Sequence, residues 1–186
     1  MCIALTQPKG SRLTEEEIDS CWTGNPDGGG FAYALDGKVI IVKETFDLPT
    51  FTRLYNERVD AHGKDSEFIV HFRWGTQGGT ADRNTHPFQV NEELAFCHNG
   101  ILRMPNHATL SDTVLYNKRV LSKMPIGFQN YDAIMEMIGS SIGGGNKLCF
   151  LDKNGETYVV NEKQGHWRED GFWFSNSGYR TYKYNQ

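Results

Sequence analysis

The chain has 186 residues, of which 38% are hydrophobic and 12% aromatic, and its formal net charge is −4. A chain of this length can bury a sizeable core, so we expect one domain spanning residues 1–186. The acidic balance argues against nucleic acid and against an anionic membrane surface, which clustered Lys and Arg would bind. No apolar run approaches the roughly 20 residues that cross a bilayer, and the N-terminus lacks a secretory signal pattern. We expect a cytoplasmic protein without a membrane or nucleic-acid partner.

The predicted elements, in chain order, alternate between antiparallel hairpins and groups of helices. Residues 2–6 predict a short strand, and Thr14–Glu17 has the sequence of a capping box that opens a helix. Residues 31–44 predict a hairpin around an Asp-Gly turn of type I′. The remaining predicted elements are a helix from Pro49, a strand at 67–74, a loop at 75–87, a hairpin over 88–90 and 94–100, helices at 109–123 and 130–142, a hairpin at 147–161 and a strand within 172–177. Thr109 and Ser111 are both available as the N-cap of the first of these two helices. This order favours a layered α+β domain over a parallel βαβ sheet.

The four cysteines are widely spaced, and none belongs to a C-x-x-C pair. A zinc ribbon or redox pair is therefore not expected, and a disulfide framework is unusual at this length and cysteine density. We expect Cys21, Cys97 and Cys149 to be buried thiols that pack like small apolar residues.

Cys2 differs from the others because it directly follows the initiator methionine. Removal of Met1 would leave a free α-amine beside the Cys2 thiol. Such an amine titrates at about 7.7–8.0, so part of it is unprotonated at neutral pH and can accept the thiol proton without a histidine. A cysteine at position 2 also occurs by chance, and Cys2 alone does not establish catalysis.

The segment "HFRWGTQGGTADRNTHPF" (71–88) places an arginine at the end of a predicted strand, before a glycine-rich loop. A guanidinium can hold a carboxylate through two parallel hydrogen bonds. The alternatives are an ordinary solvated loop, or a metal site that uses His71, His86 and His98. We disfavour the metal because no pair of these histidines has the usual ligand spacing, and we expect no metal and no cofactor.

Two short motifs further along the chain have both a structural and a chemical interpretation. The Asn-Gly of "FCHNGIL" (96–102) is most simply a turn, but it can also aim an amide NH2 and a glycine N–H at one point, as an oxyanion requires. Ser111–Thr113 is most simply a helix start, and its Asp112 carboxylate could also bind a ligand's ammonium group.

In their order along the chain, these motifs resemble the class II glutamine amidotransferase domain, a family of N-terminal-nucleophile hydrolases. The resemblance rests on "CI", "NPDGGGFAY" (25–33), "HFRWGTQG" with "NTHPF", "HNGIL" and "SDT". It covers residues 2–115, and residues 116–186 are expected to complete the same domain. It implies an α+β, four-layer αββα sandwich of two antiparallel sheets. The "HFRWGTQG" and "NTHPF" stretches are most similar to the compact, stand-alone branch of the family.

The resemblance implies a catalytic role for three residues. Cys2, exposed after loss of Met1, attacks the side-chain amide of glutamine and forms a γ-glutamyl thioester, which water converts to glutamate. Its α-amine takes the thiol proton and delivers it to the departing ammonia. Asn99 and the N–H of Gly100 match the family's oxyanion hole.

The resemblance also implies which residues bind the substrate. Arg73 matches the residue that holds the α-carboxylate of glutamine, and Asp112 the one that holds its α-ammonium group. Thr76 and Trp74 belong to the same substrate loop. The chain departs from the pattern at Gln77 and Val114, and at a triple glycine (28–30) that we expect to loosen the adjoining loop.

The use made of the ammonia stays open at this point. About 70 residues follow the last motif, fewer than a separate synthase site needs. Ammonia could pass to a synthase partner subunit, the protein could be a simple glutaminase, or its substrate could be a larger γ-glutamyl amide. Two further readings are a catalytically inactive ligand-binding module of the same fold and a metal-dependent hydrolase.

Overall fold

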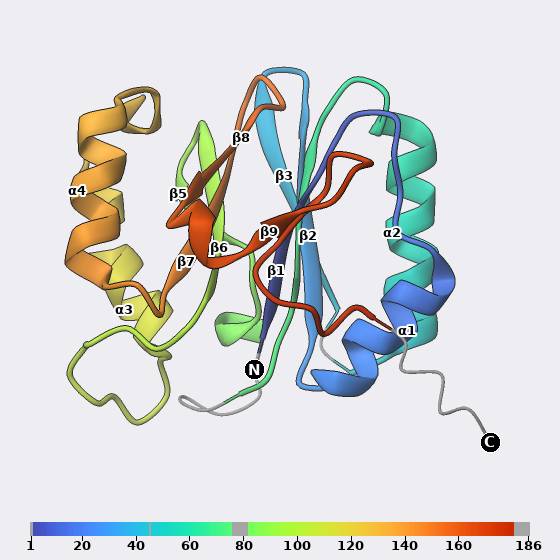
Figure 1. Ribbon diagram of the computed structural model, residues 1–186, viewed down its shortest axis with the longest axis horizontal. Helices are drawn as coiled ribbons and strands as arrows, with labels where there is room; N and C mark the ends of the chain where they lie inside the picture. Colours follow the sequence, from blue (N-terminus) through green and yellow to red (C-terminus); the bar gives the residue numbers. More distant parts are fainter. Residues whose placement is uncertain (1, 45, 76–81, 181–186) are drawn as a thin grey trace.

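Figure 1 shows the fold in the computed structural model, which describes residues 2–44, 46–75 and 82–180. Two β-sheets lie face to face in the middle of the molecule, and helices cover the outer face of each. Helices α1 (Glu15–Gly24) and α2 (Leu48–His62) cover one sheet, while α3 (Asp112–Arg119) and α4 (Asp132–Ile142) cover the other. The predicted four-layer αββα sandwich is confirmed.

Neighbouring strands run antiparallel in both sheets. The six-stranded sheet has the order β3-β2-β4-β1-β10-β9, and the four-stranded sheet has the order β5-β6-β7-β8. The first contains β1 (Ile3–Gln7), β2 (Gly29–Leu35), β3 (Lys38–Glu44), β4 (Phe68–Phe72), β9 (His166–Trp167) and β10 (Trp173–Phe174). The second contains β5 (Phe88–Asn91), β6 (Leu94–Asn99), β7 (Lys147–Asp152) and β8 (Thr157–Val160). Because β1 lies between β4 and β10, the start of the chain is held inside a sheet.

Local sequence signals set most of these boundaries. The Thr14 side chain accepts from the N–H of Glu17, whose carboxylate accepts from the Thr14 N–H, so the predicted capping box opens α1. Asp36 and Gly37 have φ of 50° and 70°, as a type I′ turn requires. Short 3₁₀ turns, which the sequence did not predict, lie at Asp82–Asn84, Leu121–Lys123, Phe128–Asn130 and Glu162–Gln164.

Helix α3 is shorter than the predicted helix over 109–123. Ser111 is its N-cap, because its hydroxyl accepts from the N–H of Val114. The two preceding residues are held outside the helix by Asn84, whose side chain bonds the carbonyl of Thr109 and the N–H of Ser111. The prediction left the cap open between Thr109 and Ser111, and this tertiary contact decides it.

Between the two sheets, small and medium apolar side chains pack together with the ring of Trp173. Cys97 and Cys149 lie directly opposite each other on β6 and β7, and both are fully buried there. Cys21 is buried with the aromatic cluster under α1 and α2. The prediction of three buried thiols is confirmed.

The expectation that the triple glycine loosens its loop is wrong. Gly29 and Gly30 belong to β2 and are close-packed. A Cβ on Gly29 would come within 2.9 Å of the Phe51 and Trp22 rings, and one on Gly30 would collide with the carbonyl oxygen of His86. These glycines allow the close approach of neighbouring segments. None of the described helices is long and apolar enough to cross a membrane.

Candidate active site

Five of the seven predicted site residues line one small cavity of about 30 Å³. They come from four separate parts of the chain: Cys2, Arg73 with Trp74, Gly100, and Asp112. The six-stranded sheet explains why Cys2 lies near Arg73 and Trp74: β1 pairs with β4, and Ile3 lies opposite Phe72. Cys2, just before β1, therefore lies beside the residues that follow β4. His86, His98, Ser111 and Thr113 complete the lining.

The Cys2 thiol is held against the backbone of Trp74. The N–H of Trp74 donates to Sγ over 3.2 Å, and the thiol can donate to the Trp74 carbonyl at 3.4 Å. Burial raises the pKa of the Cys2 thiol, although this N–H and the positive charge of Arg73 partly oppose the rise. The resting thiol is therefore protonated at neutral pH, and attack by its sulfur requires a base.

Arg73 is buried, with 3% of its surface exposed. Its backbone is fixed by two hydrogen bonds, from its N–H to the carbonyl of Gly28 and from the N–H of Asp27 to its own carbonyl. Burial lowers the pKa of the guanidinium, and the nearby carboxylates of Asp27 and Asp112 oppose this. A Cβ on Gly75 would lie 2.7 Å from the guanidinium, so a larger residue there would require the Arg73 side chain to shift. Next to this buried cation, 48% of the Trp74 surface is exposed.

Asn99 does not line the cavity, but it is anchored to the strand that carries Cys2. Its side-chain amide donates to Ser175 Oγ over 2.9 Å, and the same oxygen accepts the N–H of Ala4. The N–H of Ser175 donates in return to the carbonyl of Ala4. Asn176, the next residue, donates its side-chain amide to the Cys2 carbonyl at 2.8 Å. Sequence reasoning missed Ser175 and Asn176, because the "SNS" run after β10 has no chemical signature by itself.

Gly100 occupies a position that only glycine can fill. Its φ is +142°, in the region that L side chains rarely adopt. A Cβ would also collide with the side-chain oxygen of Asn146 and approach the carbonyl oxygen of Gly145 to 2.8 Å. The turn after β6 therefore packs directly on the loop that precedes β7.

Asp112 is buried at the first position of α3, and its carboxylate accepts hydrogen bonds from two residues, Leu102 and Thr113. One carboxylate oxygen accepts the N–H of Leu102 at 2.6 Å, and the other accepts the N–H of Thr113 at 2.7 Å. The helix-start interpretation of Ser111–Thr113 is confirmed. Asp112 lines the cavity together with Arg73, so the lining contains one residue of each charge.

The three histidines of the disfavoured metal reading do meet beside the cavity. The rings of His71 and His86 stack at 3.9 Å, and the N–H of His98 donates to His86 Nδ1. The His98 ring bonds both Thr113 Oγ1 and Asn146 Oδ1 at 2.8 Å. Burial lowers the pKa of all three, that of His71 to about 3, so they are uncharged at neutral pH.

Among the residues described, no group of three or more His, Cys, Asp or Glu side chains is arranged to hold a metal ion. The His98 ring instead ties the start of α3 to the residue behind Gly100. Thr76, the remaining predicted site residue, lies outside the described residues.

Comparison with known sequences gives short, local matches, and no family model matches the chain. It is 43% identical over 44 residues to a glutamine–fructose-6-phosphate aminotransferase (isomerizing) of Idiomarina loihiensis, and this match covers 24% of the chain and 7% of that protein. The corresponding enzyme of Leifsonia xyli is 36% identical over 91 residues, covering 48% of the chain and 14% of that protein. An uncharacterized protein of Methanocaldococcus jannaschii is 34% identical over 87 residues, covering 42% and 22%.

Among solved structures, the chain is similar to the glutamine phosphoribosylpyrophosphate amidotransferase of B. subtilis, with a TM-score of 0.52 and 18% identity over 94% of this chain and 41% of that one. The chain has the class II glutamine amidotransferase fold. A glutamine aminotransferase class-II domain protein of Silicibacter pomeroyi aligns over 94% of this chain and 87% of that one, at a TM-score of 0.45 and 13% identity. The chain spans less than a quarter of the length of the curated relatives named above.

Proposed function

We propose that this class II amidotransferase fold carries a working glutaminase site in which Cys2 is the nucleophile. The observation that carries the proposal is the meeting of Cys2 with Arg73, Gly100 and Asp112 around one cavity. Four separate segments supply these residues, and each has the chemical type that hydrolysis of glutamine needs at that place.

The substrate is proposed to be glutamine because the cavity presents one group of each sign. A free amino acid carries a carboxylate and an ammonium group, which Arg73 and Asp112 can bind respectively. The side-chain amide then extends toward Cys2. An oxyanion formed there would be stabilised by the Gly100 N–H and the second hydrogen of the Asn99 amide, since one hydrogen is bonded to Ser175.

The proposed base is the α-amine of Cys2 after removal of Met1. Because burial raises the pKa of the thiol, little thiolate is present at neutral pH, and a base is needed. The neighbouring histidines are not proposed as this base, because both ring nitrogens of His98 and Nε2 of His71 are hydrogen-bonded and the ring of His86 is stacked on that of His71. The amine takes the thiol proton as sulfur bonds to the amide carbon, and it returns the proton to the nitrogen as the C–N bond breaks and ammonia leaves. Water then attacks the γ-glutamyl thioester, which releases glutamate and restores the thiol.

We propose that the cavity walls separate when glutamine binds, because glutamine is larger than this cavity of about 30 Å³. Trp74, half-exposed beside the thiol, is a lining side chain that can turn toward solvent as they do. Hydrolysis of a larger γ-glutamyl amide is a second proposal, which the same assay addresses when such an amide replaces glutamine. Delivery of the ammonia to a synthase partner subunit is a third, which requires that subunit in the assay.

The test is a glutaminase assay combined with labelling by the glutamine analogue 6-diazo-5-oxo-L-norleucine. We expect release of glutamate, one label per chain on Cys2, and intact mass without Met1. Cys2→Ala should lose both glutamate release and labelling while its circular dichroism is unchanged, because among the described residues the thiol hydrogen-bonds to the Trp74 backbone and to no element of the core. Cys21→Ala, which removes a buried thiol outside the cavity, is the matched control and should be labelled normally. Normal glutamate release from Cys2→Ala, or an active enzyme that retains Met1, would end the proposal.

A further inference from the structure

The ring of His98 lies between two polar side chains, and both of its nitrogens are hydrogen-bonded. His98 is on β6 and 2% exposed. Its Nδ1 lies 2.8 Å from the hydroxyl oxygen of Thr113, and its Nε2 lies 2.8 Å from the side-chain oxygen of Asn146. Burial lowers the pKa of His98, so the ring is uncharged at neutral pH and carries one proton. One nitrogen therefore donates and the other accepts, and the neighbours of the ring decide which.

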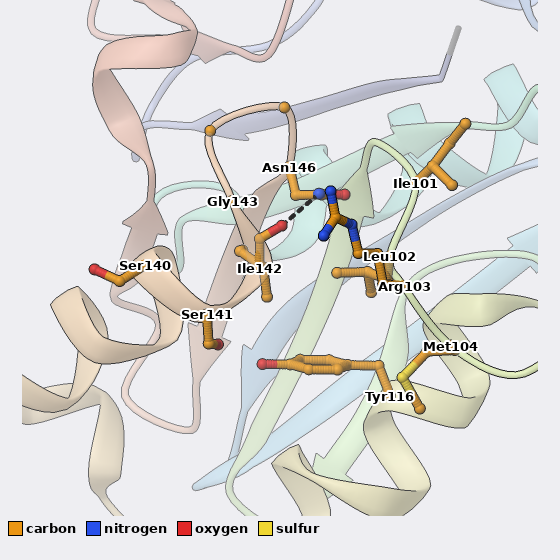
Figure 2. Close-up of a pocket in the computed structure, with 12 residues that line it drawn as sticks. Ile101, Leu102, Arg103, Met104, Tyr116, Ser140, Ser141, Ile142, Gly143 and Asn146 are labelled. Carbon is orange, nitrogen blue, oxygen red and sulfur yellow. Dashed lines mark hydrogen bonds between the residues drawn. The ribbon is translucent and has the colours of Figure 1, made fainter.

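Asn146 decides the position of this proton, because its own orientation is fixed by the backbone. Its side-chain NH2 donates to the carbonyl of Ile142 over 2.7 Å, drawn as a dashed line in Figure 2. A carbonyl can only accept a hydrogen bond, so the amide nitrogen of Asn146 points to Ile142 and the amide oxygen points to His98. That oxygen is also an acceptor only. His98 therefore carries its proton on Nε2 and has a lone pair on Nδ1.

The lone pair on Nδ1 determines where the hydroxyl of Thr113 donates. This hydroxyl has one proton and two acceptors nearby, His98 Nδ1 at 2.8 Å and a carboxylate oxygen of Asp112 at 3.3 Å. The second distance is longer than a usual O–H···O hydrogen bond, so the proton goes to His98. Asp112 then accepts the N–H groups of Leu102 and Thr113 and no other donor within the described chain. Because a carboxylate has about four acceptor positions, it can still accept from a ligand.

Loss of the Asn146 oxygen would reverse this order of donors. His98 would then donate from Nδ1 to Thr113, and the Thr113 hydroxyl would turn to the carboxylate of Asp112. That arrangement is favoured in the absence of Asn146, because hydrogen bonds to an ionised acceptor are stronger than those to a neutral one. The hydroxyl would take one acceptor position of the carboxylate and compete with a ligand for it.

We propose that Asn146 is a positioning residue that sets the affinity of this site for the ammonium group of its substrate. By holding the His98 proton on Nε2, it directs the Thr113 hydroxyl away from Asp112 and leaves the carboxylate free to bind that group. Asn146 acts through His98 and Thr113, which line the cavity, whereas Asn146 does not. The inference rests on the proposed function, which assigns the ammonium group of glutamine to Asp112.

The first measurement is NMR of the full chain with isotope-labelled histidine rings, because protonated and unprotonated ring nitrogens have distinct chemical shifts. We expect His98 to be protonated on Nε2 in the unaltered protein and on Nδ1 in Asn146→Ala, with His98→Gln used to identify its signals. Asn161→Gly is the matched control. Asn161 has a φ of 58°, which glycine also adopts, and it donates to the carbonyls of Gly139, Gly143 and Asn146. Its replacement loosens the same loop but keeps the Asn146 side chain, so His98 should stay protonated on Nε2.

The second measurement is isothermal titration calorimetry of the full chain carrying Cys2→Ala, so that turnover does not contribute. The ligands are glutamine and glutaramate, which is glutamine without its ammonium group. Asn146→Ala should weaken glutamine binding about tenfold and change glutaramate binding by no more than about twofold, because only glutamine needs the freed carboxylate. In a Thr113→Val chain, which has no hydroxyl to redirect, Asn146→Ala should not weaken glutamine binding further. Thermal unfolding shows whether each variant is folded at the assay temperature.

Three results overturn the proposal: His98 protonated on Nδ1 in the unaltered protein, an equal loss of affinity for both ligands in Asn146→Ala, or the same loss of glutamine affinity in the Thr113→Val chain. A chain that binds no glutamine, while His98 is protonated on Nε2, would contradict the proposed function. The role of Asn146 in ammonium binding would fall with it, whereas the order of protons would stand.

Discussion

Asn99 donates its side-chain amide to Ser175 Oγ over 2.9 Å, across 76 positions of sequence. The same hydroxyl accepts the N–H of Ala4, two residues from the candidate nucleophile. One serine near the C-terminal end of the described chain therefore fixes the distance between the proposed oxyanion donor and the strand that carries Cys2. This makes Ser175 a positioning residue for the proposed reaction.

Replacing Ser175 with alanine should lower kcat about tenfold, because loss of one net hydrogen bond is worth about 1–1.5 kcal/mol and Asn99 is then free to turn. The KM for glutamine should stay within about twofold, since Arg73 and Asp112 are untouched. Steady-state kinetics separates the two constants. Ser175→Thr retains the hydroxyl and should recover part of kcat. A uniform loss that tracks only a lower melting temperature would mean that the serine is purely structural.

Gly100→Ala should reduce kcat by about 10²-fold or more, the usual effect of losing one oxyanion donor. The added methyl group meets Asn146 and the Gly145 carbonyl, so the turn must shift. Gly10→Ala is the matched control. Gly10 also has a positive φ, of 78°, but no atom lies within 4 Å of its added Cβ. It should cost about 1 kcal/mol of stability from the backbone alone and leave kcat unchanged. Equal activity in the two variants would contradict the proposed role of Gly100.

Arg73→Lys should raise the KM for glutamine about tenfold, because lysine keeps the charge but loses the two-pronged contact with a carboxylate. Labelling of Cys2 by iodoacetamide, which has no α-carboxylate, should continue. Arg53→Lys alters an exposed arginine that pairs with Glu57 on α2 and should have no effect on KM. An unchanged KM in Arg73→Lys would show that the carboxylate binds elsewhere.

Stability should fall as the pH falls below neutrality, because the stacked histidines are buried in their uncharged form. Burial lowers the pKa of His71 from 6.5 to about 3. Between these values the unfolded chain binds the proton and the folded chain does not, so the free energy of unfolding decreases with decreasing pH. Each such histidine lowers the free energy of unfolding by up to about 1.4 kcal/mol for every pH unit of acidification in this range. Urea unfolding between about pH 7 and pH 5 measures this slope.

His71→Gln keeps a donor for the His98 carbonyl and should reduce the slope, whereas His107→Gln, an exposed histidine, should leave it unchanged. If the free energy of unfolding depends on pH equally in the unaltered protein, His71→Gln and His107→Gln, the acid sensitivity belongs to other groups.

Local patterns in the sequence predicted most of the elements. The capping box at Thr14, the Asp-Gly turn at Asp36 and the hairpin around Gly155 depend on interactions between residues a few positions apart, so they can be read directly. The short strand β9 was missed, because a two-residue strand has too little periodicity to recognise. The start of α3 was left open because the deciding contact comes from Asn84, 27 positions earlier than Ser111.

The sequence by itself determined the set of chemical groups: a cysteine behind the initiator methionine, an arginine after a strand, an Asn-Gly turn and an aspartate at a helix start. The order of these groups along the chain also predicted the fold, because the resemblance to a known family depends only on residue types and their sequence positions. Only the tertiary structure decided which of them meet. Pairing of β1 with β4 and β10, and the hydrogen bond between Ala4 and Ser175 beside it, join segments up to 171 positions apart. The same packing revealed the contacts of Ser175 with Asn99 and of Asn176 with Cys2, which depend on neighbours in space and leave no pattern along the chain.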